Sequence, residues 1–160
     1  MTWTIEPSQV RHPDAVAVLR EYIDDVASRY HGRQATEEEI ERALAEDPSD
    51  HLVPPTGLFL IARDGGKVTG CVGVKVATPT ITELTRMFVK PAARGHGGGS
   101  SLLLAAERAA RELGAVTMRL DTRHDLVEAR ALYARHGYRE VEPYGERLYA
   151  DHWFVKELRL

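Results

Sequence analysis

The stretch of sequence that decides the fold is a glycine-rich turn, which reads Val89-Lys90-Pro91-Ala92-Ala93-Arg94-Gly95-His96-Gly97-Gly98-Gly99-Ser100. A predicted strand leads into this turn and a predicted helix leads out of it. Glycine has no Cβ, so the backbone here can adopt positive φ and can approach a ligand closely. The unpaired N–H groups and the dipole of a helix start favour an anion. The sequence therefore predicts a phosphate-binding turn.

Other phosphate loops fit this stretch less well. The loop of nucleotide triphosphatases needs Gly-Lys followed by Ser or Thr, but Gly99 is followed by Ser100-Ser101 with no lysine. Dinucleotide-binding folds place their glycines early, inside a repeated βαβ unit, whereas Gly95, Gly97 and Gly99 come late, after a predicted antiparallel meander. A flexible turn that binds nothing stays open as the alternative when the motif is taken alone.

Upstream of the turn, the chain begins with a short predicted strand and two predicted helices. The strand covers Trp3 to Ile5. Asp14 to Tyr30 is predicted to be helical because its apolar residues recur at three- and four-residue spacing. Thr36 and Glu39 form a capping box that starts the second helix, which is expected to end near Asp47-Pro48.

The rest of the chain alternates strands and helices. The predicted strands are 58–63, 68–77, 81–89, 116–121, 138–141 and 153–158, and the predicted helices are 100–113 and 127–136. The resulting order is β-α-α-β-β-β-α-β-α-β-β. It predicts an α/β fold with a mixed, mostly antiparallel central sheet of six to seven strands flanked by about four helices. Residues 1–160 are expected to form one domain.

The composition of the chain disfavours membrane-bound, disulfide-linked, nucleic-acid-binding and metal-binding proteins. The chain has 160 residues, 43% hydrophobic and 28% charged, so it can bury a core. It contains no run of about 18 apolar residues, so no membrane partner is expected. The start lacks the pattern of a signal peptide, and the single Cys71 excludes an internal disulfide, which together favour the cytoplasm. The net charge of -3 disfavours nucleic acid, and the seven histidines show no metal-ligand spacing, so no metal is expected.

Two motifs carry a family resemblance. Arg94, Gly97 and Gly99 form an Arg-x-x-Gly-x-Gly pattern. The segment from Ala129 to Tyr138, which begins 35 residues after Arg94, reads Ala-x-x-x-Tyr-x-x-x-Gly-aromatic. In this order the motifs resemble those of the Gcn5-related N-acetyltransferase (GNAT) superfamily, and the strand from Glu83 to Val89 is similar to the family's fourth strand. The resemblance implies the GNAT fold and the formation of an amide from acetyl-CoA.

The resemblance also implies where coenzyme A binds. In the family the glycine turn holds the pyrophosphate, and the fourth and fifth strands part so that unpaired backbone groups bind the pantetheine arm. Carried onto this chain, these roles fall on Met87, Phe88, Val89, Arg94, Gly95, His96, Gly97, Gly98, Gly99 and Ser100. A backbone N–H near Met87 or Phe88 would polarise the thioester carbonyl, whereas Arg94 alone is also compatible with a solvated side chain.

Two residues are candidates for proton transfer. Tyr133 matches the family's general acid, which protonates the leaving thiolate; the alternative is that its ring only packs on the helix face. Glu83 resembles the family's general base; the alternative is a structural ion pair with Arg86 or another arginine. Asp121 and His124 are reserve candidates for the base.

The sequence departs from the family pattern at two positions. Gly98 stands where the family usually has a bulky aliphatic residue, so the helix start is expected to be loose when no ligand is bound. Leu126 stands where the family often has an asparagine, and Asp125 or His124 could replace that contact.

The acetyl acceptor is less well defined by the sequence. The predicted early helices are acidic, at Asp24, Asp25, Glu37 to Glu39, Glu41, Glu46 and Asp47. These residues could attract a cationic amine, or they could be ordinary solvated helix faces. A small-molecule primary amine is the first expectation, and a protein N-terminus or lysine is the second. Two further possibilities stay open. The chain could be a sensor that binds acetyl-CoA without turnover, and it could form a homodimer, since dimers are common in the family.

Overall fold

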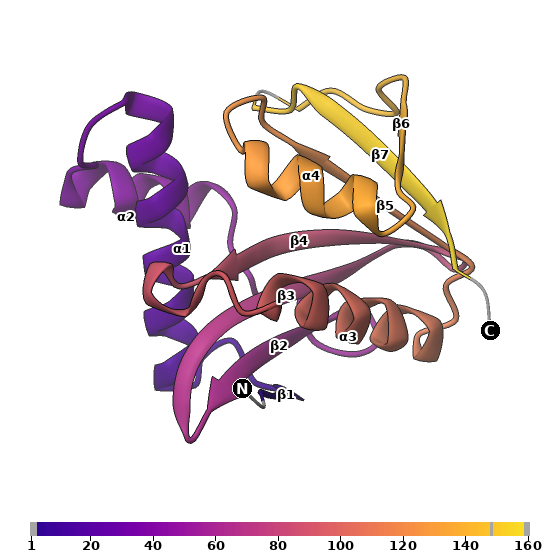
Figure 1. Cartoon of the computed structure of the whole chain (residues 1–160), viewed down its shortest axis with the longest axis horizontal. Helices are drawn as coiled ribbons and strands as arrows, with labels where there is room; N and C mark the ends of the chain where they lie inside the picture. The colour runs from indigo at the N-terminus through magenta and orange to yellow at the C-terminus, as the bar shows by residue number, and fades with distance from the viewer. Residues whose placement is uncertain (1–2, 148, 159–160) are drawn as a thin grey trace.

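The computed structural model describes residues 3–147 and 149–158. Its seven strands form one sheet in the order β1-β2-β3-β4-β5-β7-β6 (Figure 1). The elements are β1 Thr4–Pro7, α1 Pro13–His31, α2 Glu37–Glu46, β2 Gly57–Asp64, β3 Lys67–Thr78, β4 Ile81–Val89, η1 Pro91–Ala93, α3 Gly98–Glu112, β5 Thr117–Thr122, α4 Val127–Arg135, β6 Arg139–Val141 and β7 His152–Glu157. The predicted fold class and element order are confirmed, and only the short 3-10 helix η1 was not expected.

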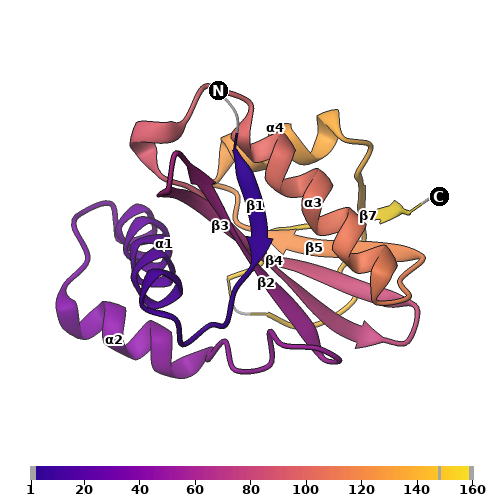
Figure 2. The same ribbon diagram turned by 90° about the horizontal axis from the view of Figure 1, so that it is seen from below.

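The sheet is mixed, as predicted. β4 and β5 are parallel, and every other neighbouring pair of strands is antiparallel. Helices α1 and α2 lie on one face of the sheet and α3 and α4 on the other (Figure 2). No helix within the described residues is long and apolar enough to cross a bilayer.

Each face of the sheet has its own apolar core. Successive residues of a strand point to opposite faces. Cys71 therefore packs with α1 residues such as Val18, while the next residue, Val72, packs with α3 residues such as Leu102. The small side chains of α3, among them Ala106, let this helix approach the sheet closely.

Local capping signals fix the early helices. The Thr36 side chain accepts from the Glu39 N–H at 3.1 Å, and Glu39 accepts from the Thr36 N–H at 2.8 Å, which is the predicted capping box. Helix α1 ends at Gly32, whose φ of 68° suits a residue without a Cβ. Predicted and observed bounds of these helices agree to within a residue.

A bulge bends β4 in its middle. Cys71 pairs with Phe88 and Gly73 pairs with Thr85, so two residues of β4 oppose one residue of β3. One of these two is Arg86, a non-glycine residue with a φ of 53°. The bulge therefore changes the direction of the backbone at this point.

The parallel strands β4 and β5 separate beyond their first residues. Ile81 to Glu83 pair with Thr117 to Arg119, and no further pairing of β4 with β5 is present among the described residues. Figure 1 shows the two strands diverging, with α4 above the opening. The β5-facing edge of β4 from Leu84 to Val89 is thus left without strand partners among the residues that the structure describes.

Candidate active site

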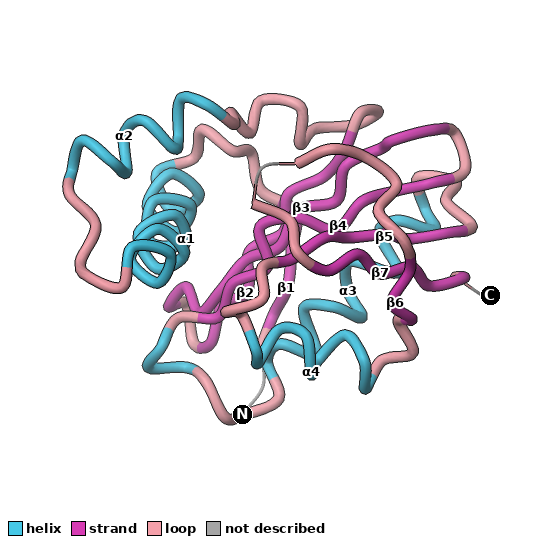
Figure 3. Tube along the Cα trace, turned by 90° about the horizontal axis from the view of Figure 1, so that it is seen from above, coloured by secondary structure: helices cyan, strands magenta, loops and turns pink. Residues whose placement is uncertain are grey.

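A cavity of about 650 Å³ fills the space where β4 and β5 part. Most of the predicted site residues line it: Met87, Phe88, Val89, Arg94, Gly95, Gly97, Gly98, Gly99, Ser100 and Tyr133. Glu83 and His96 are not among the lining residues. The remaining walls come from α1, from α4, from further residues of β4, from the ends of α2 and β5, and from the β6–β7 loop, which Figure 3 shows passing along the sheet toward α1.

The glycine turn presents bare backbone to this cavity. Gly95 and Gly97 have φ of 85° and 78°, which favour residues without a Cβ. Helix α3 begins at Gly98, two residues earlier than predicted, and Ser101 makes the first intrahelical bond, to the Gly97 carbonyl at 3.2 Å. The N–H groups that precede Ser101 in the helix have no carbonyl of their own helix to bond. The turn can therefore donate several hydrogen bonds to one anion.

Packing also requires a residue without a side chain at Gly98. A Cβ placed on Gly98 would lie 1.9 Å from the indole ring of Trp3. The ring at the start of the chain therefore occupies the space next to the helix start, where the family usually has an aliphatic side chain. This contact holds the start of α3 from outside the cavity.

Arg94 is tied to the turn rather than extended into solvent. Its Nε donates to the Val89 carbonyl at 2.9 Å, and its Nη2 lies 3.6 Å from Asp25. The guanidinium also lies 6.0 Å from the centre of the Phe88 ring. These contacts keep a positive charge beside the glycine turn.

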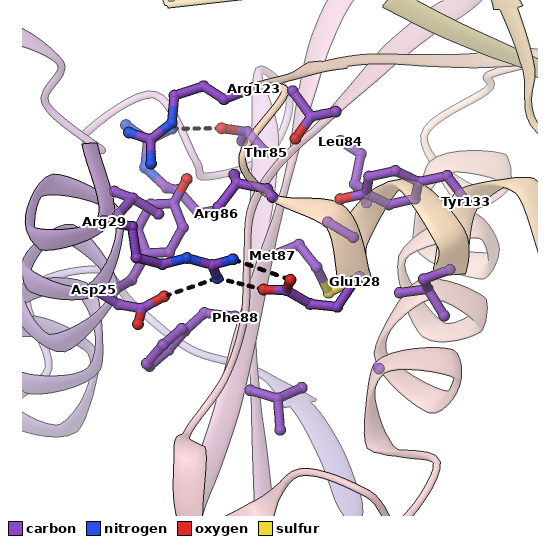
Figure 4. A pocket seen from close by; sticks show the side chains of 18 of the residues that line it. Asp25, Arg29, Leu84, Thr85, Arg86, Met87, Phe88, Arg123, Glu128 and Tyr133 are labelled. Atoms are coloured by element: carbon purple, nitrogen blue, oxygen red, sulfur yellow. Dashed lines mark hydrogen bonds and ion pairs between the residues drawn. The ribbon is translucent and has the colours of Figure 1, made fainter. Parts of the chain in front are cut away.

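An ion-pair bridge crosses the mouth of the cavity. Arg29 on α1 donates to the Glu128 carboxylate on α4 (Figure 4). It also donates to the Asp125 carbonyl at 3.1 Å. Arg29 also lies 3.9 Å from Asp25. Helices from opposite faces of the sheet are thereby joined in front of the opening.

Tyr133 is buried but faces the cavity. Its ring packs edge-on against Tyr138 at 5.8 Å between centroids and lies 6.2 Å from that of Phe154. Figure 4 shows its hydroxyl directed from α4 toward β4, and no described residue is hydrogen-bonded to it. Burial raises the pKa of Tyr133, with smaller contributions from Tyr22 and Asp121. The phenol therefore keeps its proton and can donate it.

Glu83 has the contacts of an ion pair. Its carboxylate accepts from Arg119 Nε at 2.8 Å and from Arg147 Nη2 at 2.7 Å, and 5% of its side chain is exposed. Burial alone would raise the pKa of Glu83, but hydrogen bonds and charge from Arg147 and Arg119 outweigh burial and lower it. Of the two roles open on sequence grounds, the observed contacts match the ion pair, and its partners are these two arginines rather than Arg86.

Asp121 lies in the cavity wall and is linked to the same arginine. Its Oδ2 accepts from Arg147 Nη1 at 2.6 Å. Burial raises the pKa of Asp121, and the charge of Arg147 offsets part of this increase. His124, the other reserve base, is exposed and is bonded to His152 at 3.0 Å, outside the cavity lining. Within residues 3–147 and 149–158, no three His, Cys, Asp or Glu side chains are grouped so as to hold a metal ion.

The candidate acid and base approach the opening from opposite faces of the sheet. Met118 and Leu120 of β5 pack in the core under α3, so Arg119 and Asp121 point to the other face. Tyr133 belongs to the core on the α3 side. The opening between β4 and β5 thus connects the face of the sheet that carries α3 and Tyr133 with the opposite face, to which Asp121 points. These are called the Tyr133 side and the Asp121 side of the cavity.

On the Asp121 side of the cavity, sequence reasoning named Arg86 only as a possible partner of Glu83 and missed Arg123 and Arg147. Arg86 donates to Ser49 Oγ at 2.8 Å and to the Asp47 carbonyl at 2.9 Å, which fixes the loop after α2 against the bulge. Arg123 and Arg147 come from the loops after β5 and β6. The Ser49 and Asp47 partners of Arg86 and the carboxylate partners of Arg147 lie far away in the sequence, so no local pattern identifies these contacts. Arg123 pairs with Asp125, two residues later, and this pair alone does not indicate that Arg123 lines a cavity.

The acidic early helices do not form an acidic cavity wall. Their glutamates pair with arginines of the same two helices or of the segment between them: Glu37 and Glu41 with Arg20, Glu38 with Arg42, and Glu39 with Arg33. Of the acidic residues that the sequence placed in the early helices, only Asp25 and Asp47 line the cavity. Most of this charge therefore belongs to solvated helix faces, the alternative noted above.

Comparisons with known proteins agree on one family. Residues 17–138 match the model of the Acetyltransferase (GNAT) family. The chain is 32% identical to an uncharacterized N-acetyltransferase of Schizosaccharomyces pombe over 133 residues, 82% of this chain and 78% of that protein. It is 35% identical to the IAA acetyltransferase of Azospirillum brasilense over 118 residues, 68% of this chain and 77% of that protein. The PaiA N-acetyltransferase of Thermoplasma acidophilum, solved with coenzyme A, superposes with a TM-score of 0.75 at 23% identity, over 98% of this chain and 99% of that chain.

Proposed function

Because this chain belongs to the acetyltransferase (GNAT) family and is an N-acetyltransferase, we propose that it transfers the acetyl group of acetyl-CoA to the primary amine of a small molecule. The observation that carries the proposal is the opening between β4 and β5. It joins in one cavity the glycine turn, an unpaired strand edge and the Tyr133 side chain. A cavity of about 650 Å³ is within the range that small-molecule sites occupy.

The chain's own groups suit coenzyme A. The N–H groups from Gly95 to Ser100 would bind the pyrophosphate, with Arg94 adding positive charge. Backbone groups of Met87 and Val89, on the free edge of β4, would pair with the amides of the pantetheine arm. The bulge, which consists of Arg86 and Met87, supports a role for the N–H of Met87, or that of Phe88, in polarising the thioester carbonyl. When bound, acetyl-CoA supplies an activated acetyl thioester.

Proton transfer needs an acceptor for the amine proton and a donor for the leaving sulfur. We assign Asp121 as the general base, which takes a proton from the amine as the C–N bond forms. Tyr133 donates its proton to the sulfur as the C–S bond breaks. The products are an amide and a free thiol, so each proton lost by one partner is gained by another.

Asp121 fits the role of base better than Glu83 does. Glu83 lies behind the cavity wall, and its ion pairs with Arg119 and Arg147 stabilise its charged form. Asp121 reaches the cavity and has a raised pKa, whereas the pKa of Glu83 is lowered, and both differences favour Asp121 as the group that takes the proton. In this proposal Glu83 positions Arg147, and Arg147 in turn positions Asp121.

The name of one relative supports a small acceptor. The Azospirillum brasilense relative is named for IAA, a small molecule. A protein N-terminus or lysine is the second candidate for the acceptor, and a sensor without turnover is the alternative to catalysis.

The proposal is tested by binding and by thiol release. Thermal denaturation with and without coenzyme A measures binding, and release of free thiol from acetyl-CoA measures turnover. The amine panel combines small primary amines with peptides that carry a free N-terminus or a lysine. We expect stabilisation by coenzyme A and release with small amines. Stabilisation without release for any amine would indicate the sensor, and release with peptides alone would indicate the protein acceptor.

A further inference from the structure

We propose that the acceptor carries an anionic group, a carboxylate or a phosphonate, in addition to its amine, and that Arg123 binds this group. The inference rests on the proposed acetyl transfer and specifies its substrate class. It assigns Asp121 to the amine and Arg123 to the anion. The acceptor would therefore be a zwitterion before its amine loses a proton.

The starting observation is the set of arginines on the Asp121 side of the cavity. Arg86, Arg123 and Arg147 all line it. Arg86 is committed to the loop after α2, through Ser49 and the Asp47 carbonyl. Arg147 uses both of its Nη atoms for carboxylates. Two of the three guanidiniums are thus occupied in holding the site together.

Arg123 differs because one nitrogen of its guanidinium makes no hydrogen bond to the described residues. Its Nε and Nη2 donate to the Asp125 carboxylate at 2.9 and 2.8 Å. Its Nη1 has no hydrogen-bond partner within the described part of the chain. Only 12% of the Arg123 side chain is exposed. A nearly buried guanidinium with free N–H groups beside a cavity is suited to an oxyanion from the ligand.

The position of Arg123 is fixed before any ligand binds. Asp125 holds one edge of the guanidinium, and the Tyr30 ring lies 5.5 Å from its central carbon. Tyr30 in turn contacts the Tyr149 ring from the β6–β7 loop, at 5.1 Å between centroids. Arg123 and Thr85 of β4 both line the cavity, and Figure 4 draws both side chains. Little side-chain entropy remains to be lost when an anion binds.

Two side chains of opposite charge, close together in the sequence, line the cavity. Asp121 and Arg123 are separated by one residue, and both line the cavity. One offers a carboxylate to an ammonium group, and the other offers N–H donors to an anion. A neutral or purely cationic amine would use only the first of these groups.

The test compares amines that differ only in the anionic group. Glycine is compared with glycinamide, and 2-aminoethylphosphonate with ethanolamine, by kcat/KM for thiol release. A charge-assisted hydrogen bond is worth about 1.5–3 kcal/mol, so we expect the anionic member of at least one pair to be favoured about 10- to 100-fold. The pair with the larger ratio separates a carboxylate from a phosphonate acceptor.

Variants test whether Arg123 is the group responsible. Arg123→Gln is expected to abolish the preference by raising KM for the anionic amine. Arg108→Gln, the same change at an exposed position of α3, serves as the control and is expected to leave both values unchanged. Asp125→Asn weakens the partner of Arg123 without removing Arg123, so the preference should be kept or increased. An equal loss in Arg123→Gln and Asp125→Asn would show that Arg123 only anchors Asp125, and would overturn the inference.

The inference and the proposed function fail in different ways. No thiol release with any amine would overturn the acetyl transfer on which the inference rests. Release with glycinamide and ethanolamine at rates equal to or above those of their anionic partners would leave the transfer intact and overturn the anionic acceptor alone.

Discussion

Replacing Tyr133 by phenylalanine tests the proton donor without disturbing the fold. The ring is held by Tyr138 and Phe154, and these contacts do not involve the hydroxyl. The hydroxyl has no hydrogen-bond partner in residues 3–147 and 149–158, so its removal leaves no group in that part of the chain unpaired. The variant should therefore fold as the wild type does.

The expected effects on rate and on stability differ in size. General acid catalysis contributes about 100- to 10,000-fold, which corresponds to about 2.7–5.5 kcal/mol in the barrier. We expect kcat of Tyr133→Phe to fall within this range. The free energy of unfolding should change by less than about 1 kcal/mol, because no hydrogen bond to another residue is lost. The melting temperature should then shift by less than roughly 4 °C.

Thiol release under saturating acetyl-CoA gives kcat, and thermal denaturation gives the stability. Burial raises the pKa of Tyr133, so wild-type kcat should not fall through deprotonation of this residue up to pH 9. Unchanged turnover in a folded Tyr133→Phe variant would refute the role of the phenol. A large loss of melting temperature would instead show that the hydroxyl has a structural partner.

Three further predictions concern the surroundings of the cavity. Glu83→Gln should destabilise the protein by about 3 kcal/mol in urea denaturation at pH 7, because two guanidiniums lose a buried carboxylate. Since the pKa of Glu83 is lowered from its ordinary 4.5, its stabilisation is present above that pH and is lost on acidification, so wild type and variant should converge at low pH. Arg147→Gln removes the charge that holds down the pKa of Asp121, so the acid limb of kcat/KM should move to higher pH, and an unmoved limb would argue against Asp121 as the base. Gly98→Ala should cost about 1–3 kcal/mol, seen as a lower melting temperature, because its Cβ would lie 1.9 Å from an indole ring. Gly99→Ala, where the nearest atom lies at 3.3 Å, should cost clearly less.

The parts of the fold that the sequence predicted depend on neighbouring residues. The Thr36–Glu39 capping box is a signal of four residues, and the structure has it as predicted. The strand, glycine turn and helix from Ile81 to Glu112 were recognised because glycine spacing and apolar periodicity are both local. Such patterns determine where elements begin and end.

The parts that the sequence did not predict depend on distant residues. Glu83 pairs with Arg147, which lies 64 residues later, and no local pattern links them. Trp3 covers Gly98 from the far end of the chain, so the loose helix start expected from Gly98 gains an aromatic contact. The pairing of Glu83 with Arg147 depends on sheet order, which places β5 between β4 and β7.

A crystal structure with bound coenzyme A measures the central claim most directly. The account predicts diphosphate oxygens about 2.7–3.2 Å from backbone nitrogens between Gly95 and Ser100, and the sulfur beside the Tyr133 hydroxyl. A complex in which the diphosphate lies away from this turn, or in which the sulfur lies outside the opening between β4 and β5, would contradict it.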